Sequence, residues 1–153
     1  MTSLPENAQR LENLMPLIRD RLAAGQSVKF GPRGTSMLPM LRQGIDAVEL
    51  SPISSKLKKY DLPLYQRSNG QYVLHRIVSV GETYTCIGDN QFVFEPDVRH
   101  DQMIALVTAF SRDGKRIEVS NPRYLLYCRF WCFTRPVRHL WCGVKRLVRR
   151  CLQ

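Results

Sequence analysis

Short apolar runs separated by turn residues begin at Ser27, and they constrain the fold more than any other feature of the sequence. Each run has the length of a strand, so the pattern predicts a mainly β domain. We expect strands at 27–31, 45–50, 62–67, 71–79, 83–88, 103–110 and 115–119. Three dipeptides lie between such runs, as tight hairpin turns require: Asn69-Gly70, Gly81-Glu82 and Asp113-Gly114. The strands from 62 to 88 are therefore predicted to form a meander.

A helical period precedes these strands. Apolar residues recur every three or four positions between residues 3 and 24, at Leu11, Leu14, Met15, Ile18 and Leu22. Ser3 and Glu6 fit a capping box at the start, and Gly25 supplies a stop. We expect an amphipathic helix that packs its apolar stripe on the domain, with a kink or a split at Pro16.

The segment 121–153 has a third composition. It holds eight of the 23 Lys and Arg residues and none of the 13 Asp and Glu residues. Aromatic and aliphatic side chains alternate with the arginines, and Pro136 divides the segment, so each half is expected to form a short amphipathic helix with a cationic face. The chain thus divides into an N-terminal helix (1–26), a β domain (27–120) and a basic aromatic tail (121–153).

The same composition bears on location and partners. The sequence has no run of about 18 apolar residues and no secretory signal at its start, so we expect a cytoplasmic chain that reaches an anionic membrane surface peripherally, through the tail. Nucleic acid is not the expected partner, although the sequence alone does not exclude RNA. Cys128, Cys132, His139 and Cys142 lack the spacing of a zinc site, and we expect no metal and no other cofactor.

Three stretches carry chemistry. Ser36 lies in a turn bounded by Gly34 and Pro39, His75 lies inside a predicted strand, and Gly88-Asp89-Asn90 follows one hairpin later. A serine hydroxyl is a poor nucleophile at neutral pH unless a base within hydrogen-bond reach takes its proton. Histidine, with an ordinary pKa of about 6.5, serves as that base without a specially desolvated pocket.

Taken together, these stretches resemble the S24/S26 peptidase superfamily, which includes signal peptidase I and the self-cleaving SOS repressors. Its serine box, Gly-x-Ser-Met-x-Pro, is matched at Gly34, Ser36, Met37 and Pro39, and the resemblance spans about residues 27–110. It implies a serine endopeptidase on a small β domain, with Ser36 as nucleophile and His75 as base, as in the branch that uses histidine instead of lysine. The box residues Met37 and Pro39 are expected to bind the polypeptide substrate.

The resemblance also implies that Asp89 supports the histidine, and hairpin register tests this assignment. If residues 81 and 82 form the loop, position 75 faces 88 and Asp89 lies on the other face of the strand; a loop of 81–83 instead brings 89 opposite 75. Asp97 is the alternative carboxylate. The box departs from many signal peptidases at Gly34, where a Ser or Thr helps to hold the oxyanion, which leaves the Ser36 amide and Thr35 for that task.

A second function remains open, namely a repressor-like module that cuts itself or only binds. Ala24-Gly25 is the dipeptide type at which self-cleaving repressors are cut, and it lies shortly before Ser36. No DNA-binding helix-turn-helix precedes it, so the endopeptidase is the preferred hypothesis.

Overall fold

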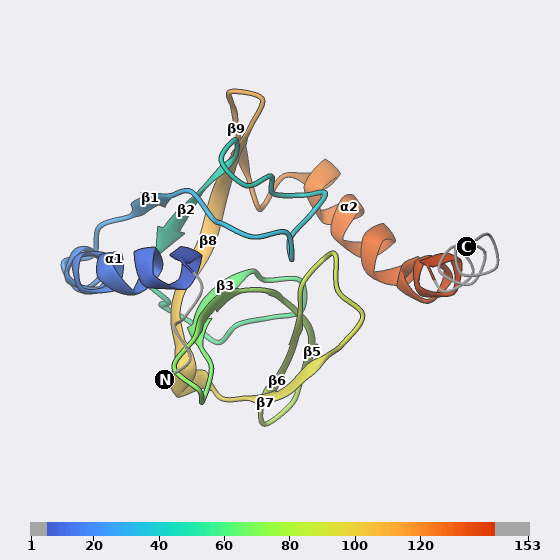
Figure 1. The fold of residues 1–153 in the computed structure, drawn as a ribbon, viewed down its shortest axis with the longest axis horizontal. Coiled ribbons are helices and arrows are strands. Elements are labelled where there is room, and N and C mark those ends of the chain that lie inside the picture. Colours follow the sequence, from blue (N-terminus) through green and yellow to red (C-terminus); the bar gives the residue numbers. More distant parts are fainter. Residues whose placement is uncertain (1–5, 143–153) are drawn as a thin grey trace.

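Strands make up the middle of the chain in the computed structural model, which describes residues 6–142 and the side chains of residues 11–142. Helices lie at both ends, and α1 and the C-terminal helical segment are on opposite sides of the sheets (Figure 1). The predicted mainly β class with an N-terminal helix and C-terminal helices is confirmed.

Two antiparallel sheets form the domain. The first has the order β1-β2-β8-β3-β4, with β9 paired to β8, and consists of β1 (Val28–Phe30), β2 (Ala47–Ser51), β3 (Pro63–Gln66), β4 (Tyr72–Leu74), β8 (Met103–Arg112) and β9 (Lys115–Glu118). The second, β5-β6-β7, consists of β5 (Arg76–Val80), β6 (Tyr84–Ile87) and β7 (Glu95–Val98). A single 3-10 turn, η1 (His100–Gln102), connects β7 to β8 among the described residues.

The predicted strand 71–79 is two strands. β4 ends at Leu74 and pairs with β3, whereas β5 begins at Arg76 and pairs with β6 in the other sheet. His75 is the residue at which the chain passes from one sheet to the other. The predicted continuous meander from 62 to 88 is therefore wrong, although all three predicted turn dipeptides do lie in the hairpin connections.

The N-terminal helix α1 (Glu6–Ala23) packs on the first sheet as its period predicts. Met15, Ile18 and Leu22 are at most 7% exposed and belong to the main core, while Leu14 is 45% exposed. The helix continues through Pro16, so the predicted split does not occur. The apolar burial on both sides of Pro16 offsets the backbone hydrogen bond that proline cannot make.

The C-terminal helix α2 (Pro122–Phe133) is part of the domain. Asn121 caps it by accepting a hydrogen bond from the Arg123 amide at 2.9 Å, and a further helical segment covers residues 135–142. Tyr124 and Cys128 are buried in the same core cluster as α1 and the first sheet. The predicted boundary at residue 121 thus does not separate an independent tail. Residues 143–153 of that predicted tail lie outside the described residues.

Candidate active site

The serine loop, residues 34–41, follows β1 and is anchored by buried apolar side chains. Met37, Met40 and Leu41 are at most 4% exposed and belong to the main core. The Leu41 amide donates to the Met37 carbonyl at 2.9 Å, which closes one turn. Ser36, directly before these anchors, is half-buried and has its side chain at the edge of a cavity.

The predicted Gly88-Asp89-Asn90 stretch lies against the serine loop. The Asn90 amide donates to the Ser36 carbonyl at 2.8 Å, and Asn90 Nδ2 donates to the Thr35 carbonyl at 3.2 Å. A Cβ at Gly88 would lie 2.6 Å from the Ser36 carbonyl oxygen, closer than real Cβ atoms approach. Glycine is therefore required at position 88 because the two backbones meet there.

His75 lies next to the same contact. Arg76 pairs with Ile87, so His75 and Gly88 are each one residue beyond this pair, at the point where Gly88 meets Ser36. The imidazole is 2% exposed. Ser36 and His75 thus both neighbour Gly88, and no hydrogen bond joins Ser36 Oγ to His75 among the residues that the structure describes.

The carboxylate that contacts His75 is Glu95, the first residue of β7. Its Oε1 lies 2.9 Å from His75 Nδ1, and its Oε2 accepts a hydrogen bond from Tyr65 Oη at 2.8 Å. Arg67 forms an ion pair with it through Nε and Nη2. Partial burial would raise the pKa of Glu95, but the hydrogen bonds from His75, Arg67 and Tyr65 outweigh burial and hold this pKa well below its usual range. Glu95 is thus a carboxylate at neutral pH.

An ionised Glu95 fixes the tautomer of the histidine. A carboxylate only accepts hydrogen bonds, so the proton of the His75–Glu95 contact belongs to Nδ1. This assignment leaves Nε2 as the acceptor nitrogen, and Nε2 has no hydrogen-bond partner among the described residues. A neutral histidine with a free Nε2 is the form that a general base requires.

Asp89, the predicted partner of His75, binds Arg76 instead, so that prediction is wrong. Arg76 Nε and Nη2 donate to the two Asp89 oxygens at 2.8 and 2.7 Å, and both side chains are fully buried. The rest of the guanidinium points toward α2, where Nη1 donates to Tyr124 Oη at 2.9 Å. Burial would lower the pKa of Arg76, but Asp89 outweighs it and raises this pKa well above the ordinary value.

Hairpin register explains the exchange. Val80 pairs with Tyr84, so the loop is Gly81–Thr83, the length that would bring Asp89 opposite His75. A β-bulge between Ile77 and Ser79 then shifts the pairing by one residue, and Arg76 faces Ile87. One shifted residue moves every later side chain to the other face, which gives Asp89 to Arg76.

The alternative carboxylate, Asp97, is exposed and has a φ of 59°, and in the described part of the chain it neither pairs nor bonds with His75. Glu95 was not predicted from the sequence because Glu-Pro-Asp is an unfavourable strand sequence. One signal for it was present: Glu95 lies two residues before the candidate Asp97, in the segment that pairs with β6 as β7.

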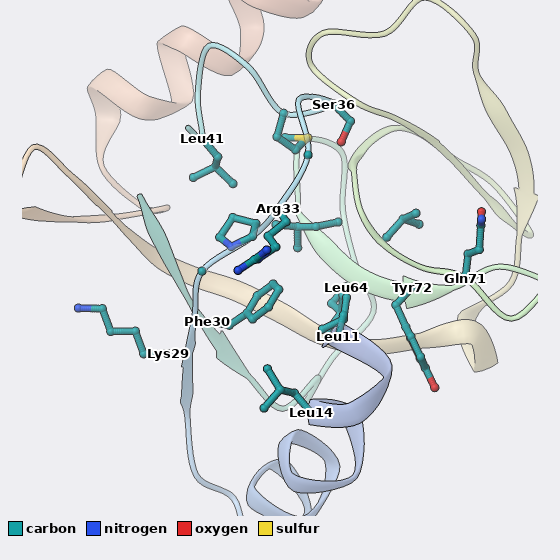
Figure 2. A pocket seen from close by; sticks show the side chains of 16 residues that line it. Leu11, Leu14, Lys29, Phe30, Arg33, Ser36, Leu41, Leu64, Gln71 and Tyr72 are labelled. Carbon is teal, nitrogen blue, oxygen red and sulfur yellow. The ribbon is translucent and has the colours of Figure 1, made fainter. Parts of the chain in front are cut away.

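A cavity of about 490 Å³ extends from Ser36 along the molecule. Phe30 and Pro32 line it from the end of β1, Val73 from β4, and Leu11 and Leu14 from α1. Figure 2 shows Ser36 at one end of this groove and Leu14 at the other, with Phe30 and Leu64 between them. Met37 lines the groove as well, whereas Pro39 lines a separate cavity on the other side of the serine loop.

Oxyanion donors are limited by the shape of the loop. Gly34 has a φ of 92°, and its amide donates to Gln43 Oε1 at 2.7 Å, so it is engaged within the loop. The Ser36 amide donates to no acceptor in the described part of the chain. It is therefore the donor available to a tetrahedral oxyanion on Ser36.

Comparison with family models, with curated proteins and with solved structures found no match. Among residues 6–142, no cluster of three or more His, Cys, Asp or Glu side chains is arranged to hold a metal ion. Within the same residues, no helix combines the length and the apolar character needed to cross a bilayer.

Proposed function

We propose that this chain is a serine endopeptidase of the S24/S26 type, with Ser36 as nucleophile, His75 as general base and Glu95 as the residue that orients His75. The observation that carries the proposal is the meeting of the serine loop, Gly88 and His75 at one point, with an ionised carboxylate on Nδ1 of the histidine. The serine-box resemblance supports the same assignment.

In the proposed reaction, Ser36 Oγ attacks the carbonyl carbon of a peptide bond and gives its proton to Nε2 of His75. The oxyanion accepts a hydrogen bond from the Ser36 amide, and Glu95 stabilises the imidazolium. The peptide C–N bond then breaks as Nε2 returns the proton to the leaving amine, which leaves an acyl ester on Ser36. Water hydrolyses that ester by the same transfers. The hydrogen bond between a nucleophile and its general base is often long in an enzyme without substrate and tightens only when substrate is bound.

The groove suits an extended peptide. β1 and β4 end the order of the first sheet, so each has a partner strand on one side only in the described structure. An extended segment of substrate adds to such an edge through main-chain hydrogen bonds, while its side chains enter the cavity. Phe30, Leu11 and Leu14 make that cavity largely apolar, so we expect small or apolar residues on the substrate side that it receives.

Self-cleavage at Ala24-Gly25 is less favoured by the geometry. Gly25 has a φ of 74°, and its amide donates to the Leu22 carbonyl at 2.9 Å, as in a helix C-terminal cap. A scissile bond must be extended to reach a nucleophile, so this dipeptide would first have to unfold from the C-terminal cap of α1.

The test is digestion of a mixed peptide library, with new termini read by mass spectrometry. Wild-type protein is expected to cleave, and Ser36→Ala is expected to lower kcat by on the order of 10⁴–10⁶ without changing the melting temperature. Ser79→Ala, at an exposed position of β5, is the matched control and should cleave normally. Equal cleavage by Ser36→Ala and wild type, or no cleavage by the wild type, rejects the proposal.

A further inference from the structure

Two arginines of the C-terminal helical segment, Arg135, which is buried, and Arg138, which is half-buried, form no ion pair with an acidic side chain in the described part of the chain. Arg135 is 6% exposed, and its Nε and Nη2 atoms are buried with no hydrogen-bond partner. Nε of Arg138 is buried in the same way. Arg76, by contrast, has both oxygens of Asp89. Because a buried cation is stabilised mainly by a paired anion, Arg135 and Arg138 retain donors that suit a ligand with negative charge.

Their protein neighbours are aromatic rings and carbonyl oxygens. The guanidinium carbon of Arg138 lies 3.7 Å from the ring centroid of Trp131, and its Nη2 donates to the Trp131 carbonyl at 2.7 Å. The Arg135 guanidinium lies 5.9 Å from the ring centroid of Phe94. Burial lowers the pKa of Arg138, and the nearby charge of Arg135 lowers it further. An anion near both groups would relieve this repulsion.

A large apolar surface surrounds the two arginines. A cavity of about 610 Å³ lies beside Arg138, between the serine loop and residues 131–142; it is lined by Leu38, Pro39, Phe92, Trp131, Leu140 and Trp141. Phe92 stacks on His139 with ring centroids 4.7 Å apart, which joins the loop before β7 to the C-terminal segment. Exposed apolar side chains continue this surface: Val93 at 78%, Phe94 at 52% and Val137 at 69%.

We propose that this surface binds an anionic phospholipid of a bilayer, with the phosphate on Arg135 and Arg138 and an acyl chain in the cavity beside Pro39. Charge complementarity and exposed apolar area both favour this ligand. Residues 121–142 contain four arginines and no acid, and the exposed rings lie next to them. An acidic peptide or free phosphate would satisfy the guanidinium groups but would leave the apolar surface in water.

The proposed lipid site does not depend on the peptidase proposal. Most of it comes from residues 92–94 and 131–142, and Asn90 and the serine-loop residues Leu38 and Pro39 complete the lining of the cavity. Binding of lipid can therefore be measured on protein whose nucleophile has been replaced.

The experiment is sedimentation of the full chain with phosphatidylcholine vesicles, with and without 30 mol% phosphatidylglycerol as an added component, at about 0.1 M salt. Wild-type protein is expected to bind only the anionic vesicles. Arg135→Gln is expected to weaken binding by more than about tenfold. Arg123→Gln, which removes the same charge from an exposed position of α2, should cost no more than the roughly fivefold that one interfacial cation contributes.

A second pair of variants tests the apolar part. Val137→Ser is expected to weaken binding to the anionic vesicles, whereas Ile45→Ser, at a similarly exposed apolar position outside this surface, should not. Equal losses from Arg135→Gln and Arg123→Gln would show general charge attraction and overturn the site. Failure to bind anionic vesicles, or displacement from them by millimolar inorganic phosphate or by RNA, also overturns it. A thermal melt of each variant identifies any that fail to fold, and Arg135→Met then replaces Arg135→Gln.

Discussion

His75 and Arg76 are adjacent in the sequence, and each binds one carboxylate on its own side of the strand. Arg76 and Asp89 have no exposed side-chain surface and lie beneath α2, where Tyr124 and Cys128 also contact the guanidinium. His75 is nearly as buried, but Glu95 keeps 21% of its side chain exposed. One pair is enclosed by the core, whereas the carboxylate of the other is partly open to solvent.

The two pairs therefore differ in role: the Arg76–Asp89 pair is structural, and the His75–Glu95 pair is the one proposed to take part in the reaction. A buried ion pair without access to solvent fixes how elements pack, and here it joins β5, the Gly88-Asp89-Asn90 stretch and α2. A partly exposed carboxylate that contacts a histidine can instead orient that histidine for proton transfer. Burial and partners, rather than sequence position, therefore indicate which acid supports the proposed reaction.

The largest effect is expected from removing α2, which covers the buried Arg76–Asp89 pair. Deletion of residues 121–153 takes Tyr124 and Cys128 out of the core and exposes Arg76. Such losses cost about 3–5 kcal/mol each, against a typical stability of about 5–15 kcal/mol, so we expect the variant not to fold. Circular dichroism and a thermal melt measure this. Deletion of 143–153 alone, which retains every described residue of that cluster, should leave the melt intact, and a folded 1–120 fragment would contradict the assignment of α2 to the domain.

This expectation revises what the sequence indicated about the tail. The alternation of aromatic residues with arginines predicted helices correctly, but periodicity does not reveal which helical face has a partner. Tyr124 and Cys128 fill the core because Arg76, a residue far away in sequence, needs polar atoms at its buried end. The local sequence pattern of a helix contains no information about such a contact with a residue far away in the sequence.

The candidate site was partly predictable for a similar reason. Ser36 and His75 have local signals, in the serine box and in a histidine within an apolar strand. The identity of the supporting acid depended on one β-bulge and on a strand, β7, whose sequence contains Glu, Pro and Asp. Neither the bulge nor an edge strand of that composition is encoded by hydrophobic alternation, which is why the sequence predicts Asp89 in place of Glu95.

Replacing each of the two acids, Asp89 and Glu95, with alanine is expected to give the next largest effects. Asp89→Ala leaves Arg76 buried without an anion and is expected to cost about 3–5 kcal/mol of unfolding free energy. Glu95→Ala, at a partly exposed position, is expected to cost less, about 1–3 kcal/mol, but to lower kcat by on the order of 10²–10⁴ because His75 loses its orienting partner. Urea denaturation and peptide cleavage measure the two effects. If Asp89→Ala folds normally and loses kcat while Glu95→Ala keeps it, the roles are the reverse of those proposed here; Asp89→Asn serves where the alanine variant fails to fold.

The smallest expected effect concerns acid pH and tests Glu95 alone. Because the folded protein lowers the pKa of Glu95 below its unfolded value of about 4.3, the carboxylate stabilises the fold fully above that pH and progressively less as pH falls below it. The stability difference between wild type and Glu95→Gln should therefore shrink between about pH 5 and pH 3. Tyr65→Phe, which removes the 2.8 Å hydrogen bond to Oε2, should shift the same loss to slightly higher pH.

Asp61→Asn is the control of opposite sign, since burial raises the pKa of Asp61 and its ionised form is the one that the fold disfavours. Urea titrations across this pH range measure all three variants, and a Glu95→Gln difference that stays constant or grows toward pH 3 would show that Glu95 is not held ionised by His75, Arg67 and Tyr65.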